Sequence, residues 1–202
     1  MIIDLRDYTT TPGKRDLLIE RCESLLFDEQ VRMGAKLFGS FRDAENPDCF
    51  VWLRGMSNMA ERKRILTAFY TNGEMWKENR KEVNSWIVDS DNVLLVRAVT
   101  DWAEPASGDS IVGMYTHVSR DPQADLTELQ RTVPAAIKAA GGRLLVTLST
   151  DPSENNYPRH PIRTGEYGFV WFASFTPDHD RPLGLHSVEE RRLLPTNRSW
   201  MR

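Results

Sequence analysis

Cysteines and long apolar runs are scarce in this 202-residue sequence, and both shortages narrow its class. The two cysteines, Cys22 and Cys49, have neither metal-ligand nor redox-motif spacing. Two isolated thiols are typical of a reducing compartment, so we expect a cytoplasmic protein. No apolar run reaches the roughly 20 residues that span a bilayer, and charges appear too early for a secretory signal. We therefore expect no membrane span.

The sequence also lacks an excess of basic residues. The sequence contains 26 Lys and Arg residues against 29 Asp and Glu residues, for a formal net charge of −3. Nucleic acids and anionic membranes are recognised by concentrated basic faces, so no nucleic-acid partner is expected. With 40% hydrophobic and 27% charged residues, the composition is typical of a folded globular protein.

Common catalytic signatures are absent as well. The sequence has no nucleophile elbow, no phosphate-binding loop and no dinucleotide-binding fingerprint. His160, His179 and His186 lie among prolines and aspartates without the spacing of a metal site. These absences disfavour hydrolysis by a serine triad, nucleotide binding and NAD chemistry, and we expect neither a metal nor a cofactor.

What is present is a clear order of elements. In residues 1–103, alternating and helical patterns predict strand, helix, strand, strand, helix, strand, which is the ferredoxin-like arrangement. The predicted strands cover residues 2–9, 36–41, 49–56 and 93–96. The stretch from Asn58 to Glu61 resembles a capping box that opens a helix, and Gly34 resembles a helix stop. Polar, turn-rich residues 104–109 are predicted to form a linker.

The pattern then begins again in residues 110–202. The triplet Phe50-Val51-Trp52 returns as Phe169-Val170-Trp171, at the same place in the order of elements. We interpret this as a tandem repeat whose second half carries an insertion at 150–168 and a shortened last helix near 186–192. An insertion of that length is typical of a lid or a binding loop, and a tethered surface loop is the plainer alternative.

Several motifs of the first half resemble the NIPSNAP family. The opening Asp4-Leu5-Arg6-Asp7-Tyr8, followed by Pro12-Gly13-Lys14, resembles the start of that family, and Phe50-Val51-Trp52-Leu53-Arg54-Gly55 resembles its third strand. Four further motifs resemble the bacterial branch of that family: Glu61-Arg62-Lys63-Arg64, Phe69-Tyr70, Trp76-Lys77 and Asp89-Ser90-Asp91-Asn92-Val93-Leu94-Leu95. The resemblance covers roughly residues 1–99.

The resemblance implies a dimeric α/β barrel, in which two ferredoxin-like sheets close face to face. Such barrels are similar in architecture to antibiotic-biosynthesis monooxygenases, muconolactone isomerases and haem-handling barrels. Because this chain contains two halves, we predict an α+β fold in which tandem ferredoxin-like repeats, 1–103 and 110–202, form a pseudo-dimeric α/β barrel. A homo-oligomer is also expected, because exposed sheet edges commonly pair. The resemblance implies a fold rather than an activity.

Strand alternation divides each predicted sheet into two faces. We expect Ile3, Leu5, Val51 and Leu53 to face the helices of the first half. The opposite face carries large aromatic and polar side chains, which are best hidden by packing the two sheets together. These are Asp4, Arg6, Tyr8, Phe50, Trp52, Arg54, Tyr115, His117, Phe169 and Trp171. They would then line the interior of the barrel.

Two interpretations of this interior stay open. In the first, the aromatics fill the barrel and Asp4 pairs with Arg6. In the second, the interior is a small-molecule pocket in which the arginines favour an anionic or carbonyl-bearing ligand. The predicted ligand-binding residues are Arg6, Tyr8, Trp52, Arg54 and Trp171, and the candidate catalytic residues are His117 and Tyr115. His117 is read as a general base, as an axial haem ligand, or as a hydrogen-bonded structural residue.

Three functions follow as hypotheses. The first is a barrel that binds a small organic ligand without chemistry. The second is a cofactor-independent monooxygenase or isomerase, in which His117, Tyr115 or the arginines polarise an aromatic or carbonyl substrate. The third is a protein-interaction scaffold, for which we expect a filled barrel and a contiguous exposed apolar patch.

Overall fold

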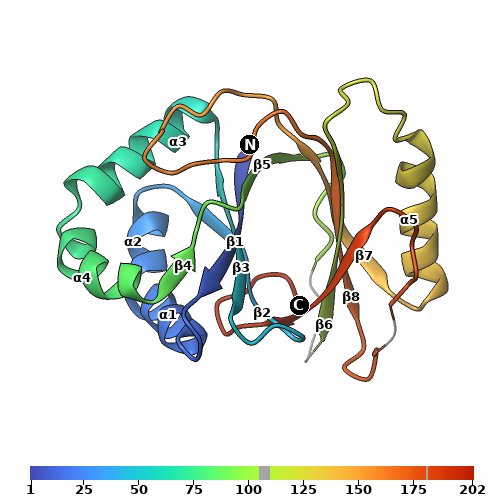
Figure 1. Ribbon diagram of the computed structural model, residues 1–202, viewed down its shortest axis with the longest axis horizontal. Coiled ribbons are helices and arrows are strands. Elements are labelled where there is room, and N and C mark those ends of the chain that lie inside the picture. Colours follow the sequence, from blue (N-terminus) through green and yellow to red (C-terminus); the bar gives the residue numbers. More distant parts are fainter. Residues whose placement is uncertain (105–109, 181) are drawn as a thin grey trace.

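The computed structural model describes residues 1–104, 110–180 and 182–202 (Figure 1). Most of the predicted linker, residues 105–109, lies outside the described residues. Within the described ranges, no helix combines the length and the apolar character needed to cross a membrane.

The first half is a ferredoxin-like unit with helices on one face. Its strands are β1 (Ile2–Thr10), β2 (Lys36–Asp43), β3 (Cys49–Met56) and β5 (Val93–Ala98), in the antiparallel order β5-β1-β3-β2. The short β4 (Ile87–Asp89) pairs with the end of β1. These positions confirm the four predicted strands to within two residues at their ends.

Helical segments connect these strands. Between β1 and β2 lie α1 (Arg15–Arg21), the π-helical turn η1 (Cys22–Leu26) and α2 (Phe27–Arg32), and Gly34 follows with a φ of 106°. Between β3 and β4 lie α3 (Met59–Leu66), the π-helical turn η2 (Thr67–Asn72) and α4 (Glu74–Ser85). The predicted cap of α3 is present, because Asn58 Oδ1 accepts the backbone N–H of Glu61 at 2.9 Å.

The second half repeats the sheet but keeps one helix among its described residues. Its elements are β6 (Ile111–Ser119), α5 (Thr127–Ala139), β7 (Arg143–Thr150), β8 (Tyr167–Phe175) and β9 (Glu189–Pro195). The strand order is β7-β8-β6-β9. The predicted short helix near 186–192 is wrong, because residues 189–195 pair with β6 and β2 as a strand. Backbone pairing on both sides determines that segment's conformation more strongly than its charged, helix-compatible composition.

The two sheets join into a closed barrel, which confirms the predicted fold class. β5 pairs with β7 and β2 pairs with β9, so an eight-stranded ring results, with β4 attached to β1 outside it. Figure 1 shows the two sheets facing each other, with α1–α4 covering the outer face of one half and α5 the outer face of the other. Closure pairs all the strands of the ring on both sides.

The barrel interior is mainly aliphatic, so the predicted orientation of the strand faces is wrong. Ile3, Leu5, Val51 and Leu53 pack in one cluster with Val112, Met114, Val170 and Phe172 of the other half. The aromatic and polar face, with Tyr8, Phe50 and Trp52, packs instead against Leu18, Phe27 and Phe69 of the helical layer. Trp171 packs against Val133 and Ile137 of α5. Trp52 and Trp171 therefore lie in separate clusters outside a barrel that is nonetheless closed.

Candidate functional site

A buried cluster of one carboxylate and three guanidinium groups lies under the helices of the first half. Arg54 donates from Nε and Nη2 to Asp4 Oδ2 at 3.1 and 2.9 Å, and Arg62 donates from Nε to Asp4 Oδ1 at 2.8 Å. Arg6 Nη1 lies 3.7 Å from Asp4 Oδ2. All four side chains are at most 2% exposed. We call this group the arginine cluster.

Strand register assembles most of the arginine cluster. Asp4 of β1 lies opposite Arg54 of β3, and Arg6 lies opposite Trp52. Side chains of residues opposite each other on antiparallel strands are neighbours on one face, and alternation keeps Asp4 and Arg6 on the same face. Arg62 reaches the cluster from the first turns of α3. The site is therefore built on strands β1 and β3, which pair without a register shift.

Burial and charge act in opposite directions on the Asp4 carboxyl group. Burial alone raises its pKa, but the nearby guanidinium groups of Arg54, Arg62 and Arg6 outweigh burial and lower the pKa from 3.8 to about 2. Asp4 is therefore ionised at neutral pH. One carboxylate against three guanidinium groups leaves the arginine cluster with an excess of positive charge.

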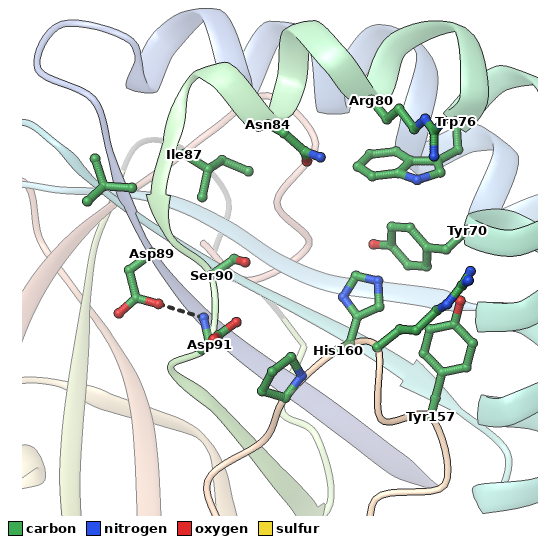
Figure 2. A pocket seen from close by; sticks show the side chains of 13 residues that line it. Tyr70, Trp76, Arg80, Asn84, Ile87, Asp89, Ser90, Asp91, Tyr157 and His160 are labelled. Atoms are coloured by element: carbon green, nitrogen blue, oxygen red, sulfur yellow. Dashed lines mark hydrogen bonds between the residues drawn. The ribbon is translucent and has the colours of Figure 1, made fainter.

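An open cavity of about 530 Å³ lies beside the arginine cluster (Figure 2). Tyr70, Trp76, Tyr157 and His160 line one side of it, and Asp89, Ser90 and Asp91 line the other. The ring of Tyr70 lies edge-on to Trp76 at 4.9 Å between centroids and 4.0 Å from the ring of His160. We call this cavity the aromatic pocket.

A second cavity of about 60 Å³ lies behind the aromatic pocket, and we call it the inner chamber. The two cavities share the lining residues Tyr70, Trp76, Asn84, Ile87, Ser90 and His160, and the inner chamber extends to Tyr8, Phe27 and Trp52. Arg6 reaches its wall, since Nη2 lies 3.4 Å from Ser90 O and 3.5 Å from His160 Nδ1. The inner chamber is therefore separated from the arginine cluster only by lining residues that contact it: Gln30 and Tyr70 contact Arg54, and Ser90 and His160 contact Arg6.

His160 is held in its neutral form. Burial lowers its pKa, and the charges of Arg6 and Arg54 lower it further, to about 2. A neutral imidazole with so low a pKa is a poor general base, but it accepts or donates hydrogen bonds according to its tautomer.

The inserted residues between β7 and β8 complete the aromatic pocket. Figure 1 shows this segment, in orange, crossing from the second half to α3 of the first. Arg62 Nη1 donates to Asn156 Oδ1 at 3.2 Å, and the hydroxyl groups of Tyr157 and Thr71 are hydrogen bonded at 2.9 Å. The segment also supplies His160. The pocket therefore contains side chains of both halves, although its polar cluster belongs to the first.

The structure separates the predicted site residues into two groups. Arg6, Tyr8, Trp52 and Arg54 lie together beside the inner chamber, whereas Tyr115, His117 and Trp171 lie on the outer side of the second-half sheet. The expected meeting of Arg6 and His117 in one barrel cavity is wrong, because both sheets turn these faces outward. The prediction of a shared interior pocket fails for the same reason.

The second-half group has structural surroundings. His117 Nδ1 is hydrogen bonded to the carbonyl oxygen of Ser187 at 2.6 Å. Burial raises the pKa of Tyr115 well above its usual value, so its hydroxyl group stays protonated at neutral pH. Trp171 is fully buried against α5. No bound group tests the catalytic prediction for His117 and Tyr115, or the haem alternative, so these stay predictions.

Register also shows why the second half lacks an arginine cluster. Tyr115 lies opposite Trp171 as Arg6 lies opposite Trp52, and Gly113 lies opposite Ala173 as Asp4 lies opposite Arg54. At these equivalent positions the carboxylate and both arginines are replaced by Gly113, Tyr115 and Ala173. The described residues therefore contain one such site per chain.

Five lining or supporting residues escaped prediction as site residues: Arg62, Tyr70, Trp76, Tyr157 and His160. All five lie on helical segments or on the insertion, whose positions over the sheet depend on long-range packing. The available signal was the density of aromatic residues at Phe69-Tyr70 and Trp76 next to a helix whose first turns carry a buried arginine.

Comparisons with known proteins identify solved structures of similar fold. No protein-family model matches the chain, and no curated protein matches its sequence. The chain is similar to the crystal structure of a "putative monooxygenase" from Lactobacillus acidophilus NCFM, with a TM-score of 0.59 and 14% identity over 96% of this chain and 93% of that one. The likeness is one of fold.

Two further solved structures extend this comparison. A "putative monooxygenase" from Fusobacterium nucleatum subsp. nucleatum matches with a TM-score of 0.54 and 10% identity, over 96% of this chain and 91% of that one. A NIPSNAP domain protein from Burkholderia xenovorans matches with a TM-score of 0.39 and 15% identity, over 53% of this chain and 96% of that one. The last likeness is too weak to carry an argument, so membership of the NIPSNAP family stays a prediction.

Proposed function

We propose that this protein binds a small planar organic ligand in the aromatic pocket of its first half. The observation that carries this proposal is the cavity of about 530 Å³ whose aromatic side continues into the inner chamber. Small-molecule sites typically have volumes of about 300–1,000 Å³, with aromatic walls and a few placed polar groups. The barrel interior, by contrast, is occupied by a cluster of buried apolar side chains.

The arrangement of the rings supports a planar ligand. The ring centroid of Tyr70 lies 4.9 Å from that of Trp76 and 4.0 Å from that of His160. A flat aromatic body gains offset-stacked or edge-on contacts with such rings, each worth about 0.5–1.5 kcal/mol beyond area burial. Trp76 is half-buried, so part of its ring is available to a ligand.

Binding of 2-naphthoate or its neutral amide, 2-naphthamide, tests this proposal by titration calorimetry. We expect at least one of the two to bind, and Trp76→Ala to weaken that binding roughly 3- to 10-fold because one ring contact is lost. Trp102→Ala is the matched control, since Trp102 stacks on Phe38 at 4.2 Å outside the pocket. Absence of binding at millimolar concentration, or equal effects of the two substitutions, would contradict the proposal.

A cofactor-independent monooxygenase is the second candidate. It is favoured by the fold shared with two "putative monooxygenases" and by guanidinium groups placed next to an aromatic pocket. Positive charge beside a phenol stabilises its oxyanion, the electron-rich form that reacts with dioxygen. One planar phenol, 1-naphthol, would consume one dioxygen and give 1,4-naphthoquinone and water, the substrate itself supplying the electrons.

Oxygen uptake distinguishes this candidate from simple binding. An enzyme is expected to consume dioxygen with 1-naphthol at a rate that falls at least tenfold in Arg6→Gln, since the oxyanion loses the guanidinium group that contacts Ser90 and His160 in the pocket wall. If oxygen uptake is no faster than in buffer without the protein, the monooxygenase candidate is rejected and only the binding proposal remains. The isomerase and scaffold hypotheses, the cytoplasmic location and the homo-oligomer stay predictions.

A further inference from the structure

We infer that the ligand carries an anionic oxygen, of a carboxylate or an acidic phenol or enol, which enters the inner chamber and is received by Arg6 and Trp52. This inference rests on the proposed function and names the chemical class of its ligand. Three observations support it: the charge imbalance of the arginine cluster, the unpaired donors on two neighbouring side chains there, and the chamber that Trp52 lines.

The charge imbalance is not corrected by other side chains in the described part of the protein. The ion pairs of Arg6, Arg54 and Arg62 within 4.0 Å all lead to Asp4. Arg54 Nη1 finds only neutral acceptors, Gln30 Oε1 at 2.6 Å and the Tyr70 hydroxyl oxygen at 3.1 Å. A buried charge without a counter-charge is costly, so an anion that reaches the cluster is attracted strongly.

Two unpaired donors mark where that anion binds. Arg6 Nη1 and Trp52 Nε1 are buried and lack a hydrogen-bond partner among the described residues, and Arg62 Nη2 is likewise unpaired. Their side chains are neighbours, since the Arg6 guanidinium carbon lies 5.6 Å from the Trp52 ring centroid. Buried donors without partners are rare in folded proteins, and a guanidinium group prefers a carboxylate or another oxyanion.

The inner chamber leaves room for such a group. Its volume of about 60 Å³ exceeds the roughly 30 Å³ that one water molecule occupies in the liquid. Water in the chamber would satisfy the donors but would leave the excess charge in place. An anionic oxygen would satisfy the donors and also neutralise the excess charge. The planar body of the ligand would remain among the rings of the aromatic pocket.

His160 fits this arrangement as the side chain between the two cavities. Its Nδ1 lies 3.5 Å from Arg6 Nη2, a long contact that an oxyanion would replace with a shorter, charge-assisted bond. Because the imidazole is neutral, displacing it removes no counter-charge from Arg6. Figure 2 shows the His160 ring pointing from the insertion toward the pocket, next to Tyr70.

Calorimetry with 2-naphthoate and 2-naphthamide tests the inference, because the two probes share one planar body and differ in charge. In the unmodified protein we expect the carboxylate to bind at least tenfold more tightly than the amide. In Arg6→Gln we expect naphthoate binding to weaken roughly 10- to 100-fold, the usual range for a lost hydrogen bond to a charged group, with naphthamide binding unchanged. Arg21→Gln is the matched control, since Arg21 pairs with Glu82 outside both cavities.

A second variant covers the case in which Arg6→Gln does not fold. Trp52→Phe keeps a ring but removes the Nε1 donor, and we expect it to weaken naphthoate binding more than naphthamide binding. If both probes bind equally and Trp76→Ala weakens both, the proposed pocket stands and the anion inference is overturned. If neither probe binds, both proposals fail.

Discussion

Replacing Asp4 by asparagine is expected to lower the free energy of unfolding by about 3–5 kcal/mol, the usual cost of removing one partner of a buried ion pair. Both carboxylate oxygens accept from guanidinium groups, Oδ1 from Arg62 and Oδ2 from Arg54. Whichever way the asparagine amide turns, its NH₂ group therefore faces an arginine donor. Three buried cations also lose their shared counter-charge.

Urea unfolding of the two proteins measures this effect, and Asp16→Asn is its control. Asp16 pairs with Arg42 and Arg15 at the surface, where its side chain is 65% exposed. Exposed pairs contribute about 0–1 kcal/mol, so the control is expected to unfold almost as the unmodified protein does. Similar losses in the two variants would show that the arginine cluster does not depend on Asp4.

The same substitution carries a pH dependence with a defined sign. The pKa of Asp4 is about 2 in the folded protein, below the ordinary 3.8 of an aspartate side chain, so the folded state favours the ionised form. The resulting stability, about 2 kcal/mol, is fully present above pH 4 and is lost as the pH falls toward 2. The difference in stability between the unmodified protein and Asp4→Asn should therefore shrink over that interval, and a constant difference would contradict the assignment.

Replacing Leu193 by alanine is expected to cost about 2–5 kcal/mol, whereas the same change at Leu194 should alter stability by no more than about 0.5 kcal/mol. Leu193 is fully buried in the aliphatic barrel interior, and Leu194 is 40% exposed. The two neighbours lie on β9, the strand that connects β6 to β2 and closes the ring. Alternation sends one inward and the other outward.

Thermal or urea unfolding of these two variants checks both the closure of the barrel and the direction of its faces. The pair is well matched, because both residues are leucines on the same strand and their positions differ by one. Equal effects would mean that β9 is not packed between the two sheets. A larger effect at Leu194 would mean that the strand is paired in the opposite register.

Much of the local structure is readable from residue patterns. The four first-half strands follow alternation, and Asn58 caps α3 as its spacing with Glu61 predicts. The paired triplets Phe50-Val51-Trp52 and Phe169-Val170-Trp171 lie on β3 and β8, which occupy equivalent places in their sheets. These features depend on contacts between residues close in the sequence or on a sequence repeat, and both can be recognised in the sequence itself.

The segment near 186–192 shows where local patterns stop. Its charged residues suit an exposed helix as well as an edge strand, and only pairing with β2 and β6 makes it β9. His160 is a second example. It lies in a proline-rich loop without any metal spacing, and it becomes part of the pocket because the insertion packs over the helices of the first half.

The sequence by itself determined which side chains share a face: alternation with period two groups Asp4 with Arg6 on β1, and Ile3 with Leu5. Only the tertiary structure decided which face turns into the barrel, because that choice depends on how well the aliphatic faces of both sheets fit together. The aromatic and charged face is covered by the helices α1–α4 and by a loop from the other half, which leave a pocket at their junction. Those contacts join residues far apart in the chain, and no local pattern specifies them.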